Sequence, residues 1–209
     1  KVMLAGDVSK LNRSGFTLTT VNEDLEGNKY EQVIPVLLTT KNQPSWLQDG
    51  CKVALKGHIT GSLKGDVYEE AVAAIPGSLA EHDEYMNIAR LIGKVRYFTR
   101  RPPTPDGKQA SGNLAISIAK NVFRAVLFDP IAVVFERSAK QGMAVQVQGA
   151  LQNREWISRT GVTNKILETR AQSDWTQLLE SPESFDPFAN FDGEKDDVVV
   201  NTPTGQAAF

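Results

Sequence analysis

The sequence predicts an all-β chain in which two small five-stranded barrels follow one another and an acidic tail ends the chain. One observation behind this is a pair of short motifs that recurs in the same order. Another is a series of short alternating apolar runs separated by clusters of Gly, Pro, Asn and Asp, which is typical of small antiparallel barrels. The third is a charge that changes sign along the 209 residues.

The repeat consists of two motifs in each half of the chain. The segment LAGDV at 4–8 returns as LIGKV at 91–95, and GCKVALKGHI at 50–59 returns as GMAVQVQGAL at 142–151. Similar lengths of chain separate the two motifs in each copy, so the halves differ only by insertions the size of loops. We therefore expect two copies of one fold.

The second copy shows the strands most clearly. Between its third and fourth strands, Asp129 suits a helix N-cap and Pro130 suits the first helical position. Five strands with a helix at this place favour a Greek-key OB-fold, and the first copy has a shorter counterpart of the helix at 44–48. We expect strands near 88–100, 113–120, 122–128, 143–156 and 164–172, and an apolar helix face formed by Ile131, Val134 and Phe135.

Charge divides the chain into three segments. Residues 1–84 carry a net charge of −4, residues 85–175 carry +8 and residues 176–209 carry −6. We expect a first OB-fold at 1–84 that is structural or binds weakly, and a basic second OB-fold at 85–175 that binds a polyanion. The segment 176–209 lacks sustained periodicity and is expected to be a disordered acidic tail.

One face of the second barrel combines aromatic and cationic residues. Alternation along 143–156 places Val145, Val147 and Leu151 inward and the row ending in Trp156 outward. Bases stack on aromatic rings while guanidinium groups neutralise phosphates, so such a face favours sequence-tolerant binding of single-stranded DNA. The candidate binding residues are Trp156, Phe128, Arg124, Arg154, Arg96, Arg100 and Arg101, with Lys52 and Lys56 on the outward side of the first copy.

Over about 85–175 the chain resembles the bacterial and phage type of single-stranded DNA-binding protein. The resemblance rests on the segments 86–95, 123–128 and 149–156, the last of which ends in Arg-x-Trp. It implies that Trp156 and Phe128 stack on DNA, and that the protein protects single-stranded DNA in replication, recombination or repair. The family has a further stacking tryptophan near Val122, where this chain has none.

The resemblance also implies partners. A disordered acidic tail in the family recruits replication and repair proteins, and the aromatic tail residues that would do so here are Phe185, Phe188, Phe191 and Phe209. The segment 33–38 is apolar on both faces, so we expect the first barrel to pack against the second barrel or a second chain. Family members that assemble four OB domains suggest a homodimer.

Other classes of protein find less support in the sequence. His58 and His82 are the only histidines, and there is neither a phosphate-binding glycine loop nor a metal-ligand spacing, so we expect no enzyme, cofactor or metal site. No apolar run would span a membrane and no export signal is visible, so we expect a cytoplasmic protein. Two alternatives stay open: a primosome or recombination accessory protein that mainly binds other proteins, and binding to RNA.

Overall fold

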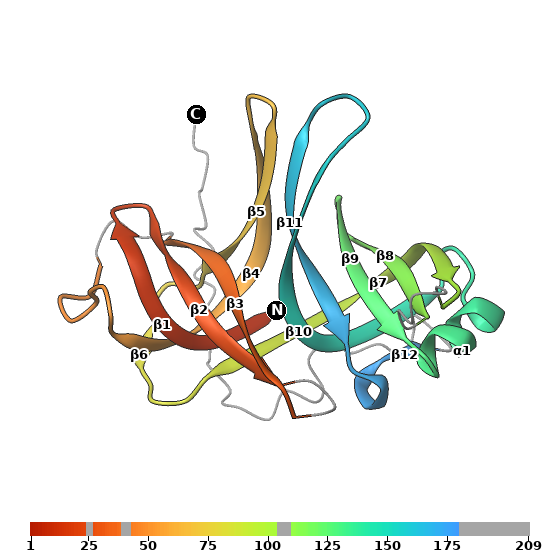
Figure 1. The fold of residues 1–209 in the computed structure, drawn as a ribbon, viewed down its shortest axis with the longest axis horizontal. Coiled ribbons are helices and arrows are strands. Elements are labelled where there is room, and N and C mark those ends of the chain that lie inside the picture. Colours follow the sequence, from red (N-terminus) through yellow and green to blue (C-terminus); the bar gives the residue numbers. More distant parts are fainter. Residues whose placement is uncertain (24–26, 39–42, 104–109, 180–209) are drawn as a thin grey trace, which may run out of the picture.

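The computed structural model describes residues 1–23, 27–38, 43–103 and 110–179 (Figure 1). The first half of the chain forms β1 (Val2–Asn12), β2 (Gly15–Glu23), β3 (Lys29–Leu38), β4 (Lys52–Lys64), β5 (Val67–Ala74) and β6 (Ala80–Glu81). The second half forms β7 (Met86–Arg101), β8 (Ser111–Ile118), β9 (Asn121–Phe128), α1 (Ile131–Ser138), β10 (Ala144–Ile157), β11 (Thr163–Ala171), the 3-10 helix η1 (Ser173–Trp175) and β12 (Gln177–Leu179).

Each half closes into a five-stranded barrel. In the first, the strands pair in the order β1, β2, β3, β5, β4 and back to β1, and β3 and β5 are parallel. In the second, β7, β8, β9, β11 and β10 repeat this order, again with one parallel pair, β9 and β11. The prediction of an all-β chain with two OB-folds is confirmed, and the five strands expected in the second copy end within two residues of their observed bounds.

The repeated glycines lie where neighbouring strands approach most closely. A Cβ atom on Gly6 would collide with the carbonyl oxygen of Thr19, and one on Gly93 would collide with that of Ser117. Glycine in a strand often marks such close backbone approach. The two positions are equivalent in β1 and β7, which gives the repeated motif a physical reason.

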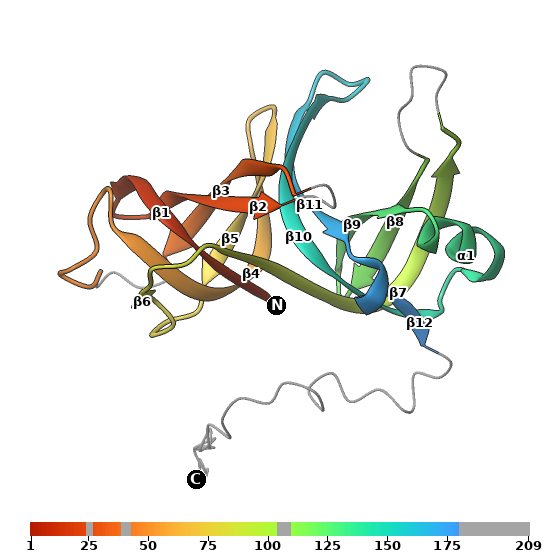
Figure 2. The same ribbon diagram turned by 60° about the horizontal axis from the view of Figure 1, so that its bottom comes forward.

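Two strand pairings join the barrels. β7 extends from the first barrel into the second, so that its first residues pair with β1 and its later ones with β10 and β8 (Figure 2). The β4–β5 hairpin and the β10–β11 hairpin stand side by side, with β5 and β11 paired in parallel (Figure 1). Across this junction Glu70 accepts a hydrogen bond from the backbone N–H of Leu167 at 2.9 Å.

The helix differs in detail from the expectation. The expectation that Asp129 caps α1 and that Pro130 is its first residue is wrong. Pro130 is the N-cap and makes no side-chain cap hydrogen bond, and the carboxylate of Asp129 is bonded to Arg100. The prediction that Val134 belongs to the apolar face is wrong: Val134 is 50% exposed, while Ala132 and Phe135 are buried against the barrel. Ala132 and Phe135 are three residues apart, so they share the inner face of the helix.

The structure corrects two further expectations. The segment 44–48 is a turn closed by a hydrogen bond from Leu47 N–H to the Pro44 carbonyl at 3.1 Å, not a short helix. The tail was expected to start at 176, but Thr176 is buried and β12 pairs with β10, as β6 pairs with β4 in the first barrel. The rest of the tail, with Phe185, Phe188, Phe191 and Phe209, lies outside the described residues.

Helices long and apolar enough to cross a bilayer do not occur in the described part of the chain.

Candidate nucleic-acid interface

The expected sorting of side chains along β10 is confirmed. Val145, Val147 and Leu151 are fully buried in the core of the second barrel. The opposite row continues past the barrel along the β10–β11 hairpin and ends at Trp156, which is half-buried. The hairpin therefore carries an indole ring on the side opposite the core.

Two arginine side chains lie beside the indole ring of Trp156. The guanidinium carbon of Arg124, on β9, lies 4.8 Å from the centroid of the indole ring, and that of Arg154 lies 5.8 Å from it. Both distances are typical of cation–π contacts. Arg154 is in turn held by Glu168, whose carboxylate is 3.1 Å from Nη1. Glu168 is only 2% exposed, so a buried carboxylate fixes one of the two guanidinium groups beside the ring.

Two adjoining hollows form one cleft over these strands. The central hollow of about 310 Å³ shares Tyr97 and Arg124 with an outer hollow of about 140 Å³. Besides these residues, the central hollow is lined by Tyr68, Glu70, Arg96, Val122, Trp156, Asn164 and Ile166, and the outer one by Thr99, Arg101, Asn113, Leu114, Arg154 and Glu168. A separate hollow of about 340 Å³ between the barrels lies on the other face of the sheet, because Glu69, Lys165 and Glu155, which line it, alternate with Tyr68, Asn164 and Trp156 along β5, β11 and β10.

A β-bulge in β7 determines which of its side chains reach the cleft. The pairing of β7 with β8 shifts between Val95 and Tyr97, so Arg96 is an extra residue. An extra residue reverses the alternation of side chains beyond it. Tyr97, Thr99 and Arg101 consequently line the cleft. Tyr97 is 47% exposed, but it was not predicted as a binding residue, because uninterrupted alternation from Val95 would place its side chain in the core.

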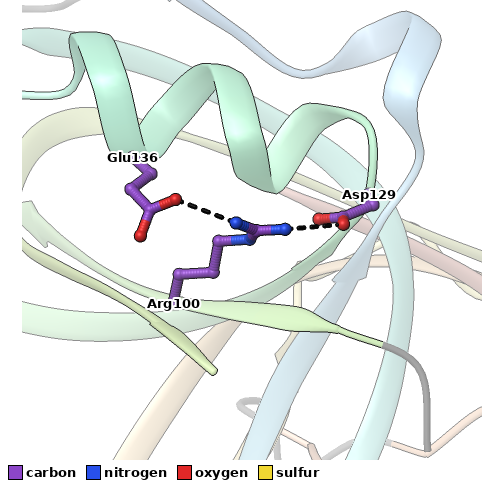
Figure 3. A network of polar contacts seen from close by, with 3 residues as sticks. All are labelled: Arg100, Asp129 and Glu136. Carbon is purple, nitrogen blue, oxygen red and sulfur yellow. Dashed lines mark hydrogen bonds and ion pairs between the residues drawn. The ribbon is translucent and has the colours of Figure 1, made fainter. Parts of the chain in front are cut away.

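The same bulge turns Arg100 away from the cleft. Its Nη2 lies 2.8 Å from the Asp129 carboxylate and its Nη1 lies 3.0 Å from that of Glu136 (Figure 3). Asp129 lies two residues before α1 and Glu136 belongs to the helix, so Arg100 joins β7 to α1 and the turn before it. Both terminal nitrogens of the Arg100 guanidinium group are thus bonded to carboxylates of the protein.

Other predicted binding residues are also not among the described residues that line the cleft. Phe128 lies beneath the guanidinium group of Arg170, 4.8 Å from its ring centroid. Lys52 lies over the ring of Tyr85 at 4.1 Å, and Lys56 is exposed on β4. The structure thus brings together Trp156, Arg124, Arg154, Arg96 and Arg101, and places Arg100, Phe128, Lys52 and Lys56 elsewhere.

Glu70 is a buried acid that lines the central hollow. Desolvation by burial raises the pKa of its carboxyl group above the ordinary value. The Leu167 N–H, the Tyr68 hydroxyl group and the charge of Arg124 oppose this shift but do not cancel it. The junction between the barrels therefore holds a carboxyl group that gains a proton more readily than a free glutamate.

Among the described residues, no group of three or more His, Cys, Asp and Glu side chains is placed to hold a metal ion.

Comparison with known proteins supports the fold. No protein-family model matches the chain, and no curated protein matches its sequence. Among solved structures, the wild-type single-stranded DNA-binding protein from Thermus aquaticus is similar with a TM-score of 0.67 and 15% identity, over 90% of this chain and 97% of that one. A deletion mutant of that protein gives 0.64 and 18%, over 89% and 96% of the two chains. The resemblance seen in the sequence is thus confirmed at the level of the fold.

Proposed function

We propose that the chain binds single-stranded DNA without sequence preference, by stacking bases on the aromatic rings of the cleft and pairing phosphates with its cations. The observation that carries the proposal is the ring of Trp156, which lies beside Arg124 and Arg154 in an open cleft. Stacking on aromatic side chains contributes about 1–3 kcal/mol per base and tolerates every base, because every base has a π-face.

The composition of the cleft suits an unpaired strand. Its described lining includes three aromatic residues that stacking requires and four cations that attract phosphates. The aromatic residues are Trp156, Tyr97 and Tyr68, and the cations are Arg96, Arg101, Arg124 and Arg154. The protein from Thermus aquaticus that shares the fold is itself a single-stranded DNA-binding protein, which supports the same ligand here.

We further propose a binding protein rather than an enzyme, with no cofactor. His58 and His82 are not among the described residues of the cleft. The cleft offers cations and stacking surfaces, which hold a nucleic acid without activating a nucleophile or a water molecule.

The wider role follows from the resemblance. We propose that the protein protects single-stranded DNA in replication, recombination or repair, and that the tail recruits partner proteins through Phe185, Phe188, Phe191 and Phe209. A homodimer with four OB domains is supported by β3, on which Val33 is 47% exposed and Leu37 is 40% exposed in the single chain. Light scattering should give twice the mass of the chain, and a monomer at high concentration would contradict the dimer.

A titration with oligo-dT, followed by tryptophan fluorescence at two salt concentrations, tests the function. We expect quenching that weakens at higher salt, and weaker binding to duplex DNA of the same length. Equal affinity for duplex and single strand, or no binding, would favour the accessory protein that mainly binds other proteins. Stacking and phosphate contacts do not read the 2′-hydroxyl group, so these contacts alone do not select DNA over RNA. A parallel titration with oligo-U measures whether the protein prefers one of the two.

A further inference from the structure

Three side chains from both barrels lie in one row across the central hollow. On the β10–β11 hairpin Trp156 pairs with Asn164, and across the parallel junction Asn164 pairs with Tyr68 of β5. Residues directly opposite one another on neighbouring strands point to the same face of the sheet. All three residues line the central hollow. The row therefore places an aromatic ring of the first barrel in the same hollow as Trp156.

The two rings lie at opposite ends of the central hollow. Adjacent strands lie about 4.8 Å apart, so the backbones at Trp156 and Tyr68, with β11 between them, are about 9.6 Å apart. The phenol end of Tyr68 lies over Gly61 of β4, which pairs with β5 on the side away from β11, so the ring of Tyr68 is turned away from Trp156. Stacked aromatic rings have centroids separated by about 4.5–7 Å, so the two rings suit two bases of one strand and not a single base held between them.

Tyr68 is held in place by its neighbours. Its ring lies over Gly61 of β4, where even a Cβ atom would collide with the phenol group. Its hydroxyl group is 3.2 Å from Oε1 of Glu70, while Oε2 of Glu70 accepts the Leu167 N–H. A glycine beneath the ring and a carboxyl group at its edge position the tyrosine without covering it completely, since Tyr68 is half-buried.

We propose that Tyr68 is a second stacking residue at the junction of the two barrels, where it binds one base of a strand that also stacks a base on Trp156, with Asn164 between them. The proposal rests on the single-stranded DNA binding proposed above and extends it to the acidic first barrel. Asn164 Nδ2 donates to the Val162 carbonyl at 3.0 Å, which orients the amide. An amide has two donor hydrogens and an acceptor oxygen, so Asn164 retains hydrogen-bonding capacity for a base edge. A strand bound at Trp156 would then continue onto the first barrel.

Tyr68→Ala in the full chain tests the site, with fluorescein-labelled oligo-dT followed by anisotropy. Loss of one stacking contact should weaken binding about 5- to 150-fold. Tyr68→Phe keeps the ring and removes the bond to Glu70, so it should bind like wild type. Tyr85→Ala is the matched control, because Tyr85 is an exposed tyrosine that is bonded to Asp7 of the first barrel and is not among the described residues of the cleft.

The outcomes separate this inference from the proposed function. If Tyr68→Ala binds like wild type while Trp156→Ala binds weakly, the site at Tyr68 is refuted and the proposed function stands. If Trp156→Ala also binds like wild type, the proposed function fails as well. If Tyr68→Phe is as weak as Tyr68→Ala, the hydroxyl group and not the ring is responsible, which contradicts stacking.

A second variant measures by fluorescence whether a base contacts the side chain at position 68, which a purely structural role of Tyr68 would not require. Tyr68→Trp in a Trp156→Phe background places a reporter ring at the junction, and oligo-dT should quench its fluorescence beyond the background measured for Trp156→Phe alone. Equal quenching in the two proteins would overturn the proposal, including in the case where Tyr68→Ala does not fold.

Discussion

Arg100 and Arg101 are adjacent in sequence, yet their replacement by alanine should have different consequences. Arg101 lines the outer hollow, whereas Arg100 is bonded to Asp129 and Glu136 on the far side of β7. Arg101→Ala should therefore weaken DNA binding and leave stability unchanged. Arg100→Ala should lower the melting temperature, because it leaves two carboxylates beside α1 without their partner, and should leave the DNA affinity of the folded protein unchanged.

The size of the effect on binding follows from the cations of the cleft. Four cations are found among its described lining residues, and Arg154 is already paired with Glu168. If the other three each neutralise one phosphate, the logarithm of the binding constant falls with the logarithm of salt concentration with a slope of about −2.1. Arg101→Ala should reduce this slope to about −1.4. Between about 50 and 200 mM salt, affinity should then fall about 7-fold instead of about 18-fold.

The assay is anisotropy with labelled oligo-dT at four or more salt concentrations, combined with thermal unfolding of both variants. A slope that changes in Arg100→Ala and not in Arg101→Ala would refute the assignment of the two sides of β7, and with it the effect of the bulge at Arg96. Equal loss of affinity in both variants would show that Arg100 leaves its carboxylates to contact DNA.

Three further variants test the fold and the junction. Phe135→Ala removes a fully buried ring that packs 6.0 Å from Phe98, so urea denaturation should show a loss of about 3–5 kcal/mol, and a loss below 1 kcal/mol would contradict the role of α1 in closing the barrel. Gly149→Ala places a Cβ atom against the Arg170 carbonyl oxygen and should cost about 1–3 kcal/mol in the same assay, with an unchanged midpoint as the contrary result. Because the pKa of Glu70 is raised in the folded state, its contribution to stability is greatest below the unfolded value of 4.5 and is lost as the pH rises toward the folded value. Glu70→Gln should therefore flatten the dependence of stability on pH above 4.5, and an identical pH profile would contradict a raised pKa.

The architecture of the chain was accessible from local patterns in its sequence. Strand alternation identified the core of β10, and the repeated glycines marked positions where backbones of neighbouring strands meet. Both features depend on residues close together in the chain. The same rule identified Arg124, Arg154 and Trp156 as neighbours, because they lie on strands whose alternation is uninterrupted up to the cleft.

The features that were missed depend on contacts between distant segments. The bulge that exposes Tyr97 is defined by the pairing of β7 with β8. Tyr68 enters the cleft only because β5 pairs with β11, about 95 residues further along the chain. Asp129 was predicted to cap α1, but the helix begins one residue later, so Pro130 is its N-cap, and the carboxylate of Asp129 is bonded to Arg100 of the distant β7.

The most direct test of the binding cleft compares Trp156→Ala with Trp175→Ala in a fluorescence and anisotropy titration with oligo-dT. Trp175 is 56% exposed and is not among the described residues of the cleft, so it is the matched tryptophan control. We predict that Trp156→Ala loses most of the quenching and weakens binding at least about fivefold, as expected for one stacked base, while Trp175→Ala retains both. Wild-type affinity in Trp156→Ala, or equal losses in the two variants, would contradict the account.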